Sequence, residues 1–150
     1  MKIGDKKIGP THPAYIIAEI GINHNGDIEN VERLIDAAIE AEADAVKFQK
    51  RTPEICTPKD LWGYIRETPW GDMTYLDYRK KLELDWGDYD HISWYCEGRI
   101  DWFASVWDAP SVDFLEEFDP VCYKVPSAML TNTELLEVVA FTGRPVIMST

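Results

Sequence analysis

The stretch Tyr15-Ile-Ile-Ala-Glu-Ile-Gly21 is apolar apart from a single charged residue, Glu19. Apolar side chains at consecutive positions, rather than at every second position, are typical of a strand that is buried on both faces. Such strands occur mainly in parallel sheets whose faces are covered by helices. We therefore predict that this run is the first strand of a parallel α/β sheet.

Four more apolar runs follow the first, and helical patterns separate them. The second to fifth strands are predicted over residues 45–49, 102–107, 121–125 and 145–149. Asp27 is the expected N-cap of a helix whose apolar residues recur at helical spacing, namely Val31, Leu34, Ile35, Ala38 and Ile39. Further helices are predicted over about 74–84 and 89–97, around Pro110, and after Thr131, which forms a T-x-x-E capping box with Glu134. Strands that alternate with helices in this way predict a parallel sheet with helical crossovers.

Two architectures fit this alternation, an open doubly wound sheet and a (β/α)8 TIM barrel. The first strand is not followed by G-x-G-x-x-G, so the dinucleotide-binding version of the open sheet has no support. A whole barrel needs about 200 or more residues, and this chain has 150. We therefore predict a TIM barrel of which about the first five strands are present, with the edges of the first and fifth strands exposed.

The composition restricts the partners of the protein. Asp and Glu outnumber Lys and Arg by 27 to 15, which gives a formal net charge of −12. This excess argues against binding to nucleic acid or to an anionic membrane surface. The N-terminus does not resemble a signal peptide, and no apolar stretch reaches the roughly 20 residues of a membrane-spanning helix. Cys56, Cys96 and Cys122 show no metal-binding spacing, and we expect free thiols in a cytoplasmic protein.

Polar side chains stand near the C-terminal ends of four predicted strands, where the chemistry of parallel barrels collects. These residues are Glu19, Lys47, Gln49, Lys124, Ser127 and Ser149. Lys47 and Gln49 are two positions apart, so they point to the same face. An ionisable side chain within an apolar strand is costly unless it is paired or functional, and a structural ion pair between Glu19 and Lys47 is one interpretation. Charges at the same end of three strands instead favour a site for an anionic substrate with one acid–base group.

Several other polar and aromatic residues have two interpretations each. His24 follows the first strand, and we expect it to form hydrogen bonds within its loop, because His12 and His91 have no ligand-like spacing to it. The charged run 77–83 is expected to be a solvated helix face. Aromatic residues of the long segment after the second strand could line a sugar site or a lid, and a role in the core or in a subunit contact fits equally well: Trp62, Trp70, Tyr75 and Trp86.

Five ordered motifs resemble the sialic acid synthase (N-acetylneuraminate synthase) family. They are Ile17-Ala-Glu-Ile-Gly-Ile-Asn-His-Asn-Gly26, Ala43-Asp-Ala-Val-Lys-Phe-Gln49, Ser111-Val-Asp-Phe-Leu-Glu-Glu117, Tyr123-Lys-Val-Pro-Ser127 with Leu130-Thr-Asn132, and Gly143-Arg-Pro-Val-Ile-Met-Ser-Thr150. The resemblance covers about residues 15–150. Thr68-Pro-Trp-Gly-Asp-Met-Thr-Tyr75 and Phe103-Ala-Ser-Val-Trp-Asp108 resemble the spore-coat-polysaccharide branch of the family.

The resemblance implies a barrel that condenses phosphoenolpyruvate with an N-acyl amino-sugar aldehyde such as N-acetylmannosamine. The product would be a nine-carbon 2-keto acid, and phosphate would be released. By position, Lys47, Lys124, Ser127 and Ser149 would hold phosphoenolpyruvate, while Glu19 would position a water or handle a proton near C2. Gln49 would face the sugar. Two ammonium groups would offset the anionic substrate in this acidic protein.

The sequence also departs from the family pattern, and these departures lead to further expectations. Glu42 and Ala128 stand where the family commonly has Gly, and a left-handed conformation at Glu42 would cost on the order of 1 kcal/mol. The family's divalent metal, Mn or Mg, would bind through two histidines beyond residue 150, so no metal ligand is expected here. The C-terminal antifreeze-like domain is expected to be absent. The chain alone is then expected to be inactive, and the longer form to be a homodimer.

Two alternatives to the synthase hypothesis stay open. Other phosphoenolpyruvate-condensing or pyruvate-condensing barrels and aldolases also place lysines on parallel strands, where a lysine of lowered pKa can form a Schiff base. A non-catalytic half-barrel that completes its sheet with a partner chain is the other alternative.

Overall fold

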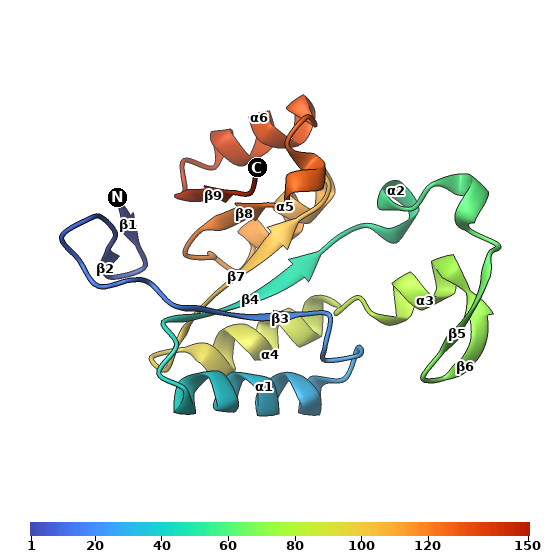
Figure 1. The fold of residues 1–150 in the computed structure, drawn as a ribbon, viewed down its shortest axis with the longest axis horizontal. Helices are drawn as coiled ribbons and strands as arrows, with labels where there is room; N and C mark the ends of the chain where they lie inside the picture. Colours follow the sequence, from blue (N-terminus) through green and yellow to red (C-terminus); the bar gives the residue numbers. More distant parts are fainter.

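The computed structural model describes all 150 residues and centres on a five-stranded parallel sheet (Figure 1). Its strands are β3 (Ile17–Gly21), β4 (Ala45–Lys50), β7 (Asp101–Val106), β8 (Tyr123–Val125) and β9 (Val146–Met148). They pair in the order of the sequence, and every pair is parallel. A doubly wound sheet would reverse its order at a switch point, whereas sequential order is that of a barrel wall. The predicted fold class, the first five strands of a TIM barrel, is confirmed.

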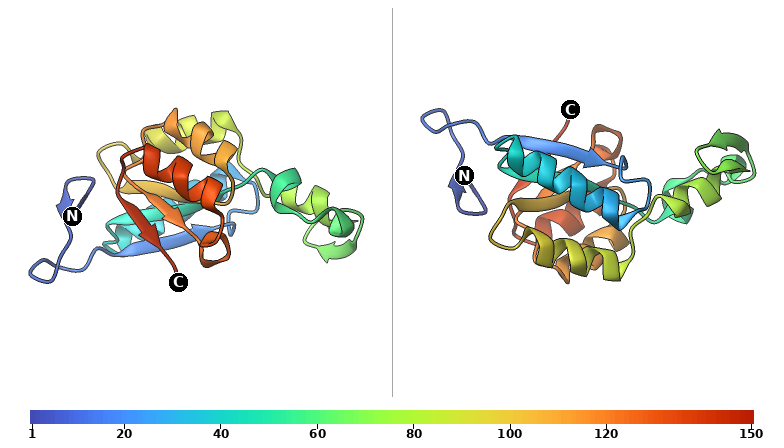
Figure 2. Two further views of the ribbon diagram at one scale, coloured as in Figure 1. Left: turned by 90° about the horizontal axis from the view of Figure 1, so that it is seen from above. Right: turned by 90° about the horizontal axis from the view of Figure 1, so that it is seen from below.

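Four helices cover one face of this sheet. They are α1 (Ile28–Glu40), α4 (Trp86–Cys96), α5 (Ala109–Glu116) and α6 (Thr133–Phe141), and Figure 2 shows them on the same side of the strands. The main hydrophobic core lies between the helices and the strands, with Phe48, Tyr89 and Tyr123 as its largest fully buried side chains. No helix of the chain combines the length and the hydrophobicity needed to cross a bilayer.

The opposite face of the sheet is apolar at one end of the strands and polar at the other. Ala45, Phe103 and Cys122 form a small buried cluster near the N-terminal ends of their strands. Ile3 joins this cluster from the N-terminal hairpin of β1 (Lys2–Ile3) and β2 (Lys6–Lys7). Because side chains alternate between faces, the next residues on this face are the polar ones predicted for the site.

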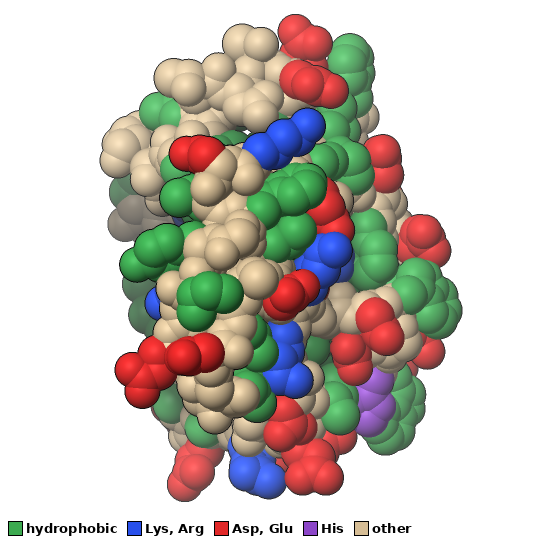
Figure 3. All heavy atoms as spheres, turned by 90° about the vertical axis from the view of Figure 1, so that its right-hand side faces the viewer, with side chains coloured by type: hydrophobic (Ala, Val, Ile, Leu, Met, Phe, Trp, Pro, Cys, Tyr) green, Lys and Arg blue, Asp and Glu red, His purple; other side chains and the backbone are tan.

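The long segment between β4 and α4 forms an arm that projects from the sheet (Figure 2). It consists of α2 (Pro53–Cys56), η1 (Lys59–Leu61), the antiparallel hairpin β5 (Ile65–Thr68) and β6 (Gly71–Thr74), and α3 (Tyr75–Lys81). The helix expected over 74–84 is therefore shorter than predicted, and the hairpin was not predicted. Figure 3 looks at the end of the molecule that carries this arm, where acidic and basic side chains are interspersed with hydrophobic ones.

Helix starts follow the expected capping chemistry with one correction. The Asp27 side chain accepts a hydrogen bond from the Glu29 backbone N–H, so the predicted cap of α1 is confirmed. The predicted box of Thr131 and Glu134 is wrong, because α6 begins one residue later. Asn132 is its N-cap and accepts from the Leu135 backbone N–H at 3.1 Å. The short helix η2 (Ser127–Met129) precedes this cap.

Candidate active site

The structure gathers all six predicted site residues around one cavity of about 400 Å³ at the C-terminal ends of the strands. Glu19, Lys47, Gln49, Lys124, Ser127 and Ser149 all line it. A volume of this size lies within the range of small-molecule sites. The strand ends of the sheet therefore meet in one open hollow, as the pattern of the sequence predicts.

Strand register explains why these side chains meet. Glu19 pairs with Lys47 across β3 and β4, and Lys124 pairs with Ser105 across β7 and β8. Gln49 in turn pairs with the same Ser105 from the other side of β7. Paired residues in a parallel sheet point to the same face. The predicted common orientation of Lys47 and Gln49 is thus confirmed.

Lys47 is held between a carboxylate and a hydroxyl. Its ammonium forms an ion pair with Glu19 and donates a hydrogen bond to Ser105 Oγ at 2.7 Å. The Lys47 side chain is 12% exposed, whereas that of Glu19 is 50% exposed. The ion pair that the sequence allowed is therefore present, and its carboxylate still reaches the open cavity. An exposed carboxylate beside a fixed ammonium can accept or deliver a proton there.

Lys124 has different surroundings. Its ammonium donates hydrogen bonds to Ser149 Oγ at 2.6 Å and to the Val125 carbonyl at 2.9 Å. No carboxylate forms an ion pair with it. Burial lowers the pKa of Lys124, the nearby Lys47 lowers it further, and Glu19 acts in the opposite direction. An anion bound between the two lysines would remove their mutual repulsion.

Of the lining residues that were not predicted as site residues, three have side chains that can form hydrogen bonds: Asn23, Ser105 and Trp107. Ser105 is 4% exposed and accepts the hydrogen bond from Lys47. It lies in the middle of the apolar run 102–107, where a small hydroxyl carries little weight in a reading of hydrophobicity. The available signal was the alternation of side chains along a strand. Ser105 lies two residues before Trp107, near the C-terminal end of the strand, and therefore on the same face.

His24 does not line the cavity. Its ring is 1% exposed, packs 6.4 Å from the ring of Phe48, and accepts a hydrogen bond at Nδ1 from the Gly26 backbone N–H. The prediction that His24 forms hydrogen bonds within its loop is confirmed. Burial lowers its pKa to about 4 against the opposing effect of a hydrogen bond with the Gly21 backbone, and the positive charge of Arg51 lowers it as well.

The residues of this chain do not form a metal site by themselves. Divalent ions need several oxygen, nitrogen or sulfur ligands. No group of three or more His, Cys, Asp and Glu side chains gathers anywhere in the chain, and Glu19 is the only carboxylate that lines the cavity. No chemical step is therefore assigned to a metal here, and the divalent ion that the resemblance implies stays a prediction.

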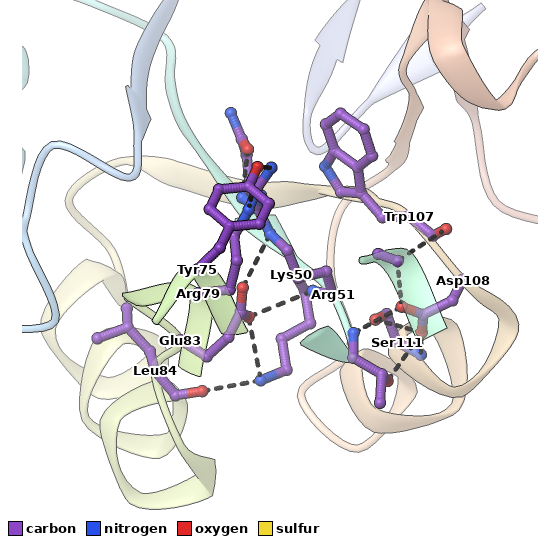
Figure 4. A network of polar contacts seen from close by, with 12 residues as sticks. Lys50, Arg51, Tyr75, Arg79, Glu83, Leu84, Trp107, Asp108 and Ser111 are labelled. Carbon is purple, nitrogen blue, oxygen red and sulfur yellow. Dashed lines mark hydrogen bonds and ion pairs between the residues drawn. The ribbon is translucent and has the colours of Figure 1, made fainter. Parts of the chain in front are cut away.

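The structure bears on two interpretations of residues 62–86. None of the four aromatic residues considered for a sugar site or a lid lines the cavity. The run 77–83 is not simply a solvated face, because the Glu83 side chain is only 11% exposed. It forms ion pairs with Arg51 and Lys50, as Figure 4 shows. Burial raises the pKa of Glu83, and the two cations oppose this effect.

Charge distinguishes this cavity from another hollow of similar size. A hollow of about 420 Å³ lies beside the C-terminal end of α4 and is lined by Glu97, Asp101 and Asp119 without any basic residue. An anion would be repelled there. The cavity at the strand ends, by contrast, contains two ammonium groups, four hydroxyl or amide side chains besides Gln49, and one carboxylate that is already paired.

Comparison with known proteins identifies relatives along the whole chain. Residues 34–150 match the family model described as the NeuB family. The N-acetylneuraminate-9-phosphate synthase of Mus musculus is 37% identical over 145 residues, which are 95% of this chain and 40% of that protein. A spore coat polysaccharide biosynthesis protein of Bacillus subtilis is 35% identical over 150 residues, 99% of this chain and 40% of that protein.

A solved structure shares the fold. The N-acetylneuraminic acid synthetase of Leptospira borgpetersenii, crystallised in complex with citrate, superposes with a TM-score of 0.85 at 30% identity. The match covers 99% of this chain and 48% of that chain. The chain thus spans about two-fifths of the length of the curated relatives that it matches.

Proposed function

The chain belongs to the NeuB family, and we propose on this basis that the protein that contains this chain is an N-acylneuraminate-type synthase. In the proposed reaction, phosphoenolpyruvate condenses with an N-acyl amino-sugar aldehyde and inorganic phosphate is released. The observation that carries the proposal is the meeting of Lys47 and Lys124 with hydroxyl donors at one end of a parallel sheet in a protein of net charge −12.

The proposed division of roles follows the contacts of each side chain. Lys124, which has no carboxylate partner, and Lys47 bind the phosphate and carboxylate of phosphoenolpyruvate. The hydroxyls of Ser127 and Ser149 complete this anion site. Hydrogen bonds between ammonium groups and oxyanions are among the strongest in proteins. Gln49 faces the sugar, and Glu19 acts at C2.

The proposed bond changes balance as follows. C3 of phosphoenolpyruvate forms a bond to the aldehyde carbon of the open-chain sugar, and the aldehyde oxygen takes up a proton. The oxygen of a water molecule bonds to C2 and gives its protons to Glu19 or to solvent. The bond between C2 and the bridging oxygen then breaks, phosphate leaves with that oxygen, and C2 becomes the ketone.

Phosphate release tests the proposal in the longest polypeptide that the gene encodes. We expect release from phosphoenolpyruvate only when an N-acyl amino sugar such as N-acetylmannosamine is also present. In water enriched in ¹⁸O, the released phosphate should contain no label, because water is added at carbon. Phosphate that carries one solvent oxygen would contradict attack at C2.

A borohydride experiment separates this proposal from the Schiff-base alternative. An aldolase lysine would form an imine with pyruvate, which borohydride reduces to a permanent adduct. We expect no adduct at Lys47 or Lys124. An adduct at either lysine would replace the proposed synthase reaction by aldolase chemistry.

A further inference from the structure

Lys50, Arg51 and Glu83 form a buried charged cluster (Figure 4), and none of the three lines the cavity. The Arg51 side chain is 4% exposed, and its Nε lies 2.8 Å from Glu83 Oε1. The same carboxylate accepts a hydrogen bond from the Arg51 backbone N–H at 3.3 Å and lies 3.7 Å from Lys50 Nζ. Lys50 also donates to the Leu84 carbonyl at 2.8 Å. The cluster joins the end of β4 to the end of the arm.

Packing alone gives little reason for such a cluster. Removing charges from water is expensive, and buried ion pairs are often no more stabilising than well-packed apolar residues. Burial lowers the pKa values of Arg51 and Lys50, which shows that desolvation opposes their charged forms here. The cluster therefore calls for a role beyond stability, and its one side-chain hydrogen bond to a residue that lines the cavity supplies a candidate.

That contact is a hydrogen bond from Arg51 to the side chain of Gln49. Arg51 Nη2 donates to Gln49 Oε1 at 2.5 Å. A primary amide has one accepting end and one donating end, whereas a guanidinium can only donate. The carbonyl end of Gln49 must therefore face Arg51, and its NH₂ group must face away.

Gly21 shows where the NH₂ group of Gln49 lies. A Cβ atom built on Gly21 would lie 3.4 Å from Gln49 Nε2 and 3.0 Å from Glu19 Oε1. The donating end of the amide is thus on the cavity side, in the space that Gly21 leaves open beside the Glu19 carboxylate. Trp107 lines the cavity and covers Arg51, whose guanidinium carbon lies 5.3 Å from the centre of the Trp107 ring.

We propose that Arg51 is a positioning residue that fixes Gln49 as a hydrogen-bond donor toward the second substrate. The inference rests on the proposed function and deepens it. Gln49 then binds an acceptor oxygen of the amino-sugar aldehyde, a carbonyl or a hydroxyl lone pair, and discriminates against a sugar that offers only a donor at that position. Arg51 itself, behind Trp107, does not touch the substrate.

Two substitutions at Gln49 test whether this residue donates a hydrogen bond to the second substrate. Both are made in the longest polypeptide that the gene encodes. Gln49→Glu keeps an acceptor for Arg51 but removes the donor toward the cavity, and Gln49→Leu removes both. We expect each to raise the KM for the amino sugar about tenfold or more and to change the KM for phosphoenolpyruvate less than twofold. A Gln49→Glu variant with the wild-type KM for the sugar would show that Gln49 accepts from the substrate, and the inference would fail.

Substitutions at Arg51 separate positioning from folding. Arg51→Met leaves Glu83 buried without its main partner, so the single variant is expected to be unstable. The double variant with Arg51→Met and Glu83→Met removes both of these charges and leaves Lys50 with its hydrogen bond to the Leu84 carbonyl, so it should fold. We expect the double variant to show a raised KM for the sugar, like the Gln49 variants, and a nearly unchanged KM for phosphoenolpyruvate. Recovery of the wild-type KM for the sugar would reduce Arg51 to a structural residue.

A spectroscopic measurement distinguishes failure of this inference from failure of the proposed function. The Arg51 guanidinium signals can be identified in ¹⁵N spectra by their loss in the double variant. We expect Gln49→Leu to shift these signals and to speed their exchange with solvent. Unchanged signals would overturn the contact itself, whether or not the wild-type protein releases phosphate.

Discussion

Glu19 and Lys47 form an ion pair in the cavity at the strand ends, and this pairing makes opposite predictions for binding and for turnover. Half of the Glu19 side chain is exposed, and its partner Lys47 is nearly buried. Removing the carboxylate frees the ammonium for an anion, but it also removes the proposed acid–base group. The two effects can be separated in steady-state kinetics.

We therefore predict that Glu19→Gln lowers kcat about 100-fold or more, which is the usual contribution of a general acid–base residue. The KM for phosphoenolpyruvate should not rise, because Lys47 no longer has a competing carboxylate. Glu40→Gln makes the same change of charge at an exposed position on α1 and should leave both constants unchanged. A Glu19→Gln variant with kcat within threefold of wild type would refute the assigned role.

His24 couples stability to pH. Its pKa is about 4 in the folded chain and about 6.5 in an unfolded one. The unfolded state binds more protons between these values, so the contribution of the neutral ring is complete above pH 6.5 and is lost as the pH falls toward 4. The loss amounts to about 3 kcal/mol.

Denaturant unfolding between pH 7 and pH 4 checks this prediction against a His24→Gln variant. Other groups titrate in both proteins, so the difference between the two curves isolates His24. We expect the free energy of unfolding of the wild type to fall more steeply with acidification. Parallel curves over this range would mean that His24 does not titrate on unfolding.

At the scale of elements, the end of α1 contains a predictable strain. Glu42 has a φ of 56°. This is the left-handed conformation that we considered for Glu42, which stands where the family commonly has glycine. Its N–H donates to the Ile39 carbonyl, and the Ala43 N–H donates to the Ala38 carbonyl. These two bonds form a Schellman motif, in which glycine is usual at the position of Glu42.

Glu42→Gly should therefore stabilise the protein by about 1 kcal/mol, which corresponds to a rise in Tm of about 2–4 °C. Ala37→Gly, at an exposed position within the same helix, should destabilise it by about 1 kcal/mol. Thermal unfolding of both variants measures the contrast. A Glu42→Gly variant that unfolds at a lower temperature than wild type would contradict the strain.

The elements that sequence patterns predicted well are those with strong periodicity. The continuous apolar run around Glu19 was predicted correctly as a strand, although β3 is only partly buried and not covered on both faces. The regular apolar face of α1 likewise has one simple solution, a helix. The hairpin β5–β6 was missed because the side chains of Ile65–Thr68 are mostly exposed and show no alternation of burial. The cap of α6 was misplaced by one residue because Thr131 and Asn132 are both good caps, and local sequence does not decide between them.

Burial was harder to predict than position. Glu83 was expected on a solvated face because its neighbours in sequence are charged. Its burial depends on Arg51 and Lys50, which lie more than thirty positions away in the sequence. Ser105 was missed for a related reason, because its importance comes from contacts with strands β4 and β8. Contacts between distant segments thus account for most of what sequence patterns left out.

At the scale of the whole molecule, the sheet separates two functions along its strands. The apolar cluster of Ala45, Phe103 and Cys122 fills the N-terminal end of one face, and the polar cavity occupies the other end. In parallel barrels the first region stabilises and the second reacts. A chain of net charge −12 concentrates two ammonium groups in that second region, where an anionic substrate would gain the most from them.

Calorimetric titration of phosphoenolpyruvate into the longest polypeptide of the gene tests this account most directly. Lys124→Ala removes a charged donor from the cavity, and Lys59→Ala removes the same charge from an exposed position on the arm. We predict that Lys124→Ala raises Kd about 10- to 100-fold, the effect of losing a hydrogen bond to a charged group, and that Lys59→Ala changes it less than twofold. Wild-type affinity in the Lys124→Ala protein, or equal weakening in both variants, would contradict an anion site at the strand ends.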